Sequence, residues 1–558
     1  MTRNPFATVG LFASTRLATW SLVLMALVAT TAVAPRVDAR QPPAVVGPVV
    51  RWTADDRFGM DADGDGRMDL PNTSEYVHNR RSSCSGACPS TLFALHFDAG
   101  LSGIAVPAMS GLPILTYQWI VSGASLDSSL HYVRTAPHLD LSLAEGEYSV
   151  EMRMLIRLPW ARLTTRTVEA VTVEDLLIVA IGDSYASGEG NPEVRRTEVV
   201  PALWAEGGSQ EADAANSAAH RSTVAWPARV ALAMERADRH SSVTFVSMAA
   251  TNARIDAGIV AAQGAGLAVS QLDALQAVVG ERRIDLLLIQ EGGNDIGFSR
   301  VVRGLVEADP LFDPVCYDQK LSNVFDSVRD GDWTRGAGVT FDLPFRLGCR
   351  VETRDGPHYP GLVGLAEAFD RVAAGLDAFD IRRVLLVGYP DPTGSDAEGT
   401  TCDEIVGDTT PPLRFHEIDE TEQARAVAEV LNPLNAALAS IAAAEGWHFV
   451  GGVAEPFARG HGYCAPWPDY GYPTDAAGRR LLGGPLAFPD AWYRNPGKFS
   501  SGALVGGGAV TWYRTAAQSS ELQGPDSRYA TTGTLHPNEI GHEAIARLVL
   551  AALAAAGG

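Results

Sequence analysis

Leu176-Leu-Ile-Val-Ala-Ile181 runs directly into Gly182-Asp-Ser-Tyr-Ala-Ser-Gly-Glu-Gly-Asn-Pro192. Six consecutive apolar residues followed by turn-forming residues are typical of a buried parallel strand that ends in a tight loop. Ser184 lies just beyond the strand, and the carboxyl ends of strands are where open α/β sheets bind ligands. An ordinary Ser/Gly turn is the alternative, and the rest of the chain decides between the two.

Alternating strands and helices are predicted from residue 175 onward. Strand candidates are 176–181, 243–247, 285–289, 384–387 and 447–450, and helices are expected over 363–379, from Pro227 to about 239, and over 422–445 with a bend at Pro433. This alternation predicts a three-layer α/β/α domain with a five-stranded, flavodoxin-like parallel sheet over residues 175–556. Residues 299–360 and 459–528 do not fit the pattern and are expected to form long loops that wall the binding cleft.

Size and charge limit the function classes. The 558 residues are enough for two or three domains, and 66 acidic against 44 basic residues give a formal net charge of -22. Such a charge disfavours nucleic-acid binding and polybasic membrane binding.

The first 39 residues resemble an export signal. Arg3 and Arg16 precede an apolar run over 17–34, and Val37-Asp-Ala39 is a small-residue cleavage site. We expect cleavage, secretion and no integral membrane span in the mature chain, with an uncleaved anchor as the alternative.

Six cysteines follow this segment, an even number that suggests disulfides in an exported protein. Proximity in sequence favours the pairs 84–88, 316–349 and 402–464. Only Cys84 and Cys88 have zinc-like spacing and no second pair matches them, so zinc is set aside.

Residues 48–174 contain short alternating segments and no helical pattern, which predicts a small all-β sandwich. Trp119 and the strand around Tyr148 loosely resemble immunoglobulin-like or PKD-type modules. Within this region, 61–72 has the spacing of a calcium loop that resembles those of dockerins, with a glycine at its sixth position. The residues expected at the metal are Asp61, Asp63, Asp65, Arg67 and Asp69. The predicted role of Ca²⁺ is structural, and a solvated acidic turn is the alternative.

Three further blocks follow the Ser184 loop in order: Met248-Ala-Ala250, Gly292-Gly-Asn-Asp295 and His536-Pro-Asn538. Together with Gly182-Asp-Ser184, this series resembles the SGNH (GDSL) hydrolases, and His220-Arg-Ser222 resembles a segment of their secreted actinobacterial lipases. The resemblance implies Ser184 as nucleophile and His536 as base, with an oxyanion hole formed by the Ser184 N–H, a backbone N–H near Ala250 and the amide of Asn294 in the Gly293-Asn294 turn. No cofactor is implied for catalysis.

One position departs from the family pattern. The family places an aspartate three residues before the histidine, where this chain has Gly533. Either a main-chain carbonyl orients His536, or an acid such as Asp526 arrives from a loop.

These features predict a secreted serine esterase or lipase that acts on small-molecule or lipid esters. A carbohydrate acetylesterase is the alternative with the same chemistry. A calcium-dependent surface-binding protein with an inactive hydrolase domain is the alternative from another class.

Overall fold

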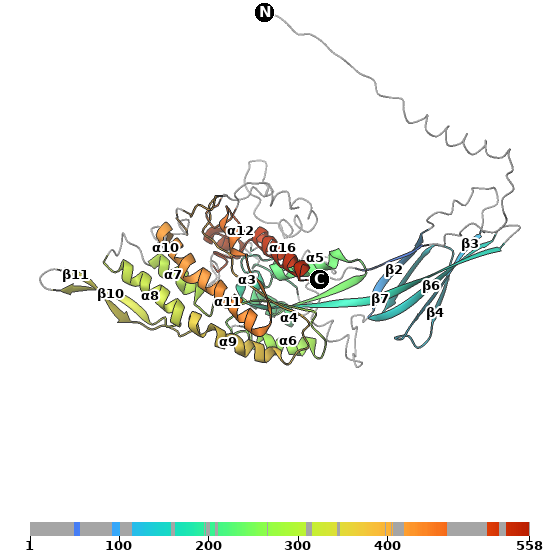
Figure 1. The fold of residues 1–558 in the computed structure, drawn as a ribbon, viewed down its shortest axis with the longest axis horizontal. Coiled ribbons are helices and arrows are strands. Elements are labelled where there is room, and N and C mark those ends of the chain that lie inside the picture. Colours follow the sequence, from blue (N-terminus) through green and yellow to red (C-terminus); the bar gives the residue numbers. More distant parts are fainter. Residues whose placement is uncertain are drawn as a thin grey trace, which may run out of the picture.

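A computed structural model describes residues 49–55, 92–100, 114–157, 162–194, 196, 201–206, 210–264, 266–307, 315–342, 346–396, 398–402, 404–405, 418–465, 511–523 and 532–556. The predicted signal segment, the predicted calcium residues, Cys84, Cys88 and Asp526 lie outside these ranges. The fold class is mixed α/β, as the sequence predicts (Figure 1).

The strands are β1 (Val49–Ala54), β2 (Phe93–Gly100), β3 (Ile114–Gly123), β4 (Leu130–Arg134), β5 (His138–Leu143), β6 (Gly146–Arg157), β7 (Arg162–Gly182), β8 (Ser241–Ser247), β9 (Leu286–Gln290), β10 (Arg335–Asp342), β11 (Arg346–Thr353), β12 (Val384–Val387), β13 (Glu404–Ile405), β14 (Ile418–Asp419) and β15 (His448–Val450). The helices are α3 (Ser184–Ser187), α4 (Gln210–Ala219), α5 (Trp226–Ala237), α6 (Gln271–Val279), α7 (Phe298–Glu307), α8 (Tyr317–Asp330), α9 (Gly361–Leu376), α10 (Glu420–Ala426), the π-helical turn η2 (Val427–Leu431), α11 (Asn432–Glu445), α12 (Ala454–Ala458), α15 (Ala516–Gln523) and α16 (Glu539–Ala555).

β7 is the strand on which the rest of the fold is assembled. Its first half pairs with β6 in antiparallel register up to Val173, and from Glu174 it pairs in parallel with β8, and further along with β9. β9 in turn pairs in parallel with β12, and β12 pairs in parallel with β15. β7 therefore crosses the predicted domain boundary at residue 174 without a break, and only its pairing partners change there (Figure 1).

Two buried cores lie along this strand. One fills the space between the β1-β2-β5 sheet and the β3-β6-β7 part of the large sheet, with Trp52, Phe97, Trp119 and Met152 among its side chains. The other surrounds the parallel strands and contains the apolar residues at the end of β7. Helices α5 and α16 contact each other, whereas α6 and α9 lie on the opposite side of the sheet in Figure 1.

Two predicted helical features differ in detail. The bend expected at Pro433 is instead a π-helical turn, η2, placed just before it, since proline cannot donate the backbone hydrogen bond that a regular helix needs. Residues 299–360, expected to be long loops, contain α7, α8 and the β10–β11 hairpin, which projects from the end of the molecule away from β2 (Figure 1).

Among the described residues, one helix, over Glu420–Glu445, is long and apolar enough to cross a membrane by length and composition.

Candidate active site

Ser184 begins α3, immediately after β7. Gly182 has φ +141°, and a Cβ atom there would lie 2.1 Å from the Gln290 carbonyl oxygen, so only glycine fits between the two strands. The amide of Gln271 donates to the Gly182 carbonyl and accepts its N–H, at 2.8 and 2.9 Å. The Asp183 side chain accepts the Tyr185 N–H and caps α3. The strand end is thereby fixed where it presents the serine.

His536 lies on the loop that leads into α16. Asn538 is the N-cap of that helix, with its side-chain oxygen accepting the N–H groups of Ile540 and Gly541. Leu535 has φ +61°, a left-handed conformation that is rare for a branched side chain. Its carbonyl accepts the Tyr185 hydroxyl at 2.7 Å, and its N–H donates to the Arg514 carbonyl. These bonds maintain a backbone shape that turns the imidazole toward Ser184.

The two predicted residues are in hydrogen-bond contact, with Ser184 Oγ 2.7 Å from His536 Nε2. His536 Nδ1 lies 3.1 Å from the carbonyl oxygen of Thr534. Because a carbonyl can only accept, Nδ1 carries the proton and Nε2 is left to accept the serine hydroxyl. Burial lowers the pKa of His536, which favours this neutral form. Because Gly533 supplies no acid, the sequence leaves either a main-chain carbonyl or an acid from a loop to orient His536. The structure shows a main-chain carbonyl, that of Thr534, in this position.

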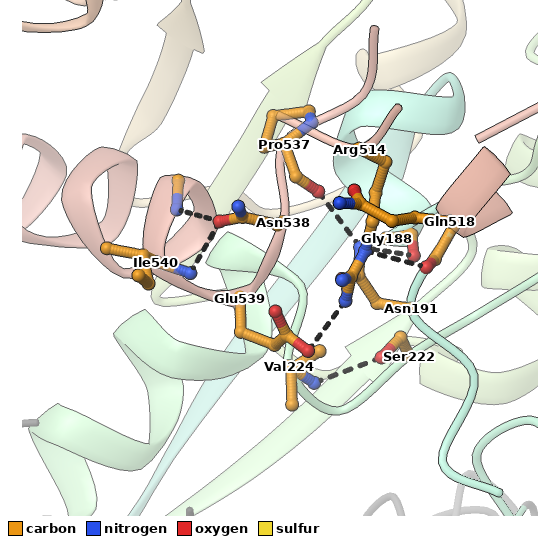
Figure 2. A network of polar contacts seen from close by, with 12 residues as sticks. Gly188, Asn191, Ser222, Val224, Arg514, Gln518, Pro537, Asn538, Glu539 and Ile540 are labelled. Atoms are coloured by element: carbon orange, nitrogen blue, oxygen red, sulfur yellow. Dashed lines mark hydrogen bonds and ion pairs between the residues drawn. The ribbon is translucent and has the colours of Figure 1, made fainter. Parts of the chain in front are cut away.

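A buried arginine joins the serine loop to the histidine loop. Arg514 donates to the side chains of Asn191 and Glu539 at 2.7 and 2.6 Å, and to the Gly190 carbonyl at 3.2 Å. Asn191 in turn donates to the Pro537 carbonyl at 3.0 Å. Figure 2 shows Arg514 between these two segments, which lie more than 300 residues apart in sequence. This network fixes the separation of the nucleophile and the base.

The loop after β9 brings Asn294 to the same edge of the sheet. Its side-chain amide donates one hydrogen to the Ala253 carbonyl at 2.9 Å, and an amide has two hydrogens to donate. The neighbouring Gly293 N–H donates to the Tyr389 hydroxyl at 2.9 Å. Gly293 thus supports the loop through its backbone.

Ala250, predicted near the second oxyanion donor, has a different contact. Its N–H donates to the Gly182 carbonyl at 3.0 Å, and this bond links the loop after β8 to the end of β7. A donor engaged in this bond is unavailable to a reacting oxygen. In this structure, Ala250 shapes the site through the Gly182 contact.

Three buried carboxyl groups lie beneath these loops. Burial raises the pKa of Asp183 to about 7 and that of Asp295 to about 6. Burial and the charges of both aspartates raise the pKa of Glu291 well above its ordinary value. Asp295 accepts the Ile255 N–H at 3.1 Å, and Asp183 accepts the Tyr185 N–H at 2.9 Å, so both carboxyl groups hold the loops in shape.

Sequence reasoning missed Glu189, Tyr389 and Arg514 as parts of the site. Glu189 is in the quoted strand-and-loop stretch, but only the fold reveals that its carboxylate is buried beside the histidine loop. Tyr389 comes from the loop after β12. Arg514 comes from a segment with no recognisable motif.

An apolar cavity of about 100 Å³ lies next to the site. Tyr185, Gly293 and Leu535 line it, and each is a chain neighbour of Ser184, Asn294 or His536. Phe298 also lines it, with its ring centroid 6.2 Å from that of His536. The loop after β12 contributes Tyr389, Pro390 and Pro392 to the wall. Most of the aliphatic side chains come from α7, η2 and the start of α11: Val301, Val302, Leu305, Val427, Val430, Leu431 and Leu434.

No protein-family model matches the sequence, and no curated protein matches it. Among solved structures, the chain is similar to an extracellular lipase from Streptomyces rimosus, with 17% identity and a TM-score of 0.36, covering 68% of this chain and 99% of that one. It is also similar to phospholipase A1 from Streptomyces albidoflavus NA297, with 19% identity and a TM-score of 0.29, covering 58% and 98%.

Proposed function

We propose that the protein is a serine esterase that hydrolyses carboxylic esters through an acyl-enzyme. The observation that carries this proposal is the 2.7 Å contact between Ser184 Oγ and His536 Nε2, with Nδ1 directed at the Thr534 carbonyl. A serine hydroxyl is a weak nucleophile until a neighbouring base takes its proton, and this arrangement supplies the base in the required tautomer.

The steps follow from these groups. Ser184 Oγ attacks the ester carbonyl carbon while its proton moves to His536 Nε2. The imidazolium then returns this proton to the leaving alkoxide as the C–O bond breaks. Water then attacks the acyl carbon while its proton moves to the same nitrogen, and the imidazolium returns this proton to Ser184 Oγ as the acyl–oxygen bond breaks and the acid leaves.

The tetrahedral intermediates carry a negative oxygen that needs hydrogen-bond donors. We assign the backbone N–H of Ser184, which as the first residue of α3 has no intrahelical acceptor, and the second hydrogen of the Asn294 amide. Ala250 is not assigned a donor role, because its N–H is bonded to Gly182.

The cavity beside the dyad favours an apolar acyl group over acetate. An acetyl group would not need an aliphatic space lined by α7 and η2, whereas a longer acyl chain buries its methylenes there at about 0.8 kcal/mol each. We therefore propose lipid-like esters as substrates, in a secreted enzyme of SGNH type.

The test is hydrolysis of p-nitrophenyl acetate, butyrate, octanoate and an acetylated xylan by wild type, Ser184→Ala and His536→Ala. We expect wild-type kcat/KM to rise from acetate to octanoate and both variants to lose at least about a thousandfold in kcat. Equal turnover by wild type and Ser184→Ala would refute the proposed nucleophile. Preference for acetylated xylan would support the acetylesterase, and a folded but inactive wild type would support the surface-binding alternative.

A further inference from the structure

The packing of Gly533 explains why no acidic side chain stands three residues before His536. A Cβ atom on Gly533 would lie 2.7 Å from Gly190 Cα and 2.9 Å from Ser519 Oγ. The first of these contacts is with backbone, which cannot move aside. The loop therefore has no room for an aspartate at this position, and any negative charge near His536 comes from another residue.

Glu189 places a carboxylate on the same side of the loop. Its side chain is fully buried, and Oε1 accepts the Gln523 amide at 2.6 Å and the Thr532 hydroxyl at 2.7 Å. A Cβ atom on Gly533 would lie 3.3 Å from the same Gln523 Nε2. The carboxylate thus lies close to the space into which a residue-533 side chain would extend.

The second oxygen of Glu189 is also occupied. Oε2 lies 2.7 Å from His220 Nδ1, and the His220 ring stacks on Trp204 with centroids 4.3 Å apart. Burial raises the pKa of Glu189, but the charge and hydrogen bond of His220, the charge of His536 and a hydrogen bond from Thr251 together lower it to about 2. This lowered pKa favours the carboxylate form of Glu189.

We propose that Glu189 is a positioning residue for His536, replacing the missing aspartate in two ways. Its bond to Thr532 fixes the start of the 532–536 loop, which carries the Thr534 carbonyl that orients Nδ1. Its charge stabilises the imidazolium that forms when Ser184 loses its proton. Glu189 makes no contact with a reacting atom, so it acts through the histidine.

Electrostatic interactions at His536 support the second role. Two titratable groups change the pKa of its imidazole: Glu189 raises it and His220 lowers it, with the Glu189 effect the larger. His542 from α16 is also in electrostatic contact with it, and the Tyr185 ring lies against it with centroids 4.8 Å apart. Among these groups, Glu189 is the one whose negative charge favours the imidazolium.

The test compares Glu189→Gln with Glu193→Gln. Glu193 is a buried carboxylate four residues further along the same loop, and it accepts the Thr223 N–H and hydroxyl and the Ser222 hydroxyl. We expect Glu189→Gln to lower kcat about tenfold and to move the acid limb of kcat/KM about one pH unit lower, the equivalent of one pKa unit of lost imidazolium stabilisation. Glu193→Gln should leave the limb in place. Identical limbs in both variants would overturn the charge role.

Two more variants separate the charge of Glu189 from its hydrogen bond to Thr532, which fixes the start of the 532–536 loop. Thr532→Val removes a donor to Glu189 while keeping the charge, so kcat should fall without a shift of the acid limb. Glu189→Asp keeps the charge on a shorter side chain and should retain the wild-type limb, and if Glu189→Gln fails to fold, a shifted limb in Glu189→Asp contradicts the charge role by itself. An acid limb shifted in Glu189→Asp as far as in Glu189→Gln would contradict the charge role. An unchanged kcat in Thr532→Val would contradict the role of the Glu189–Thr532 hydrogen bond.

This inference rests on the proposed function, but one readout is independent of turnover. The His536 imidazole can be titrated by NMR in wild type and Glu189→Gln, and its pKa should be lower in the variant. If wild type hydrolyses no ester and this pKa still falls, the esterase proposal fails while the electrostatic role of Glu189 stands. If wild type is active and the pKa does not change, the charge role of Glu189 fails alone.

Discussion

Tyr389 donates its hydroxyl to Asp183 Oδ2 at 2.5 Å. The same hydroxyl oxygen accepts the Gly293 N–H at 2.9 Å. One phenol therefore connects the loops after β7, β9 and β12, which carry the nucleophile, the proposed oxyanion donor and the cavity wall. The catalytic geometry depends on this link between loops as much as on the reacting residues.

Removing the phenol should loosen all three loops. Tyr389→Phe leaves the buried Asp183 carboxyl without this donor, which we expect to destabilise the fold by about 1–3 kcal/mol and to lower kcat. Tyr513→Phe is the matched control, since Tyr513 is fully buried and its hydroxyl has no hydrogen-bond partner among the described residues. Urea unfolding measures both, and equal losses in the two variants would contradict the linking role.

Asn294→Ala tests the oxyanion assignment. Loss of one preorganised donor lowers kcat by about 10²–10³-fold in other acyl-transfer sites, and we expect a fall in this range with little change in KM. Ser299→Ala alters an exposed position at the start of α7 and should have no such effect. A kcat for Asn294→Ala within twofold of wild type would remove Asn294 from the site.

The buried carboxyl groups should make stability depend on pH. The pKa values of Asp183 and Asp295 are raised on folding to about 7 and about 6, so their contribution is fully present below about pH 4 and is lost as pH rises through about 6 to 7. The pKa of Glu291 is also raised well above its ordinary value, so its contribution is likewise lost as pH rises. Glu291→Gln removes one of these groups without removing its volume. Its Tm should exceed that of wild type at pH 8 but not at pH 5, and a pH-independent difference between the two proteins would contradict this origin.

Filling the apolar cavity should select against long acyl chains. Val302 on α7 lines it, and Val302→Phe should lower kcat/KM for octanoate by about tenfold or more while acetate hydrolysis changes little. Val363→Phe makes the same substitution at a side chain that is 75% exposed, and it should leave the ratio of the two substrates at its wild-type value. Parallel losses on both esters in Val302→Phe would place the acyl chain elsewhere.

The disulfide between Cys402 and Cys464 joins residues 62 positions apart in sequence. Loop-closure entropy gives a disulfide of this span about 4 kcal/mol of stabilisation. The double variant Cys402→Ala/Cys464→Ala should therefore have a lower Tm than wild type under non-reducing conditions. A reductant should lower the Tm of wild type more than that of the variant, and equal responses would show that this bond does not contribute.

Short-range patterns in the sequence predicted much of the fold. The apolar runs at 243–247 and 384–387 coincide with β8 and β12, and Pro227 lies in the first turn of α5, because apolar runs and prolines act locally. The predicted pairs 316–349 and 402–464 are both present as disulfides. The long strand β7 was not predicted, since its two halves have different burial patterns and read as separate elements.

The site was only partly predictable for a related reason. Ser184 and His536 belong to motifs, whereas Glu189 and Tyr389 act through contacts between segments distant in sequence. The missing aspartate at Gly533 was visible in the sequence. The reason for it, the close approach of Gly190, exists only once the two loops have packed together.

The most direct measurement of the central claim is covalent trapping of Ser184. Wild type, Ser184→Ala and His536→Ala are incubated with a fluorophosphonate and examined by intact-mass spectrometry and peptide mapping. We expect one adduct on wild type, located on Ser184, no adduct on Ser184→Ala, and labelling slowed by at least about a hundredfold in His536→Ala. An adduct on another residue, or undiminished labelling of Ser184→Ala, would contradict this claim.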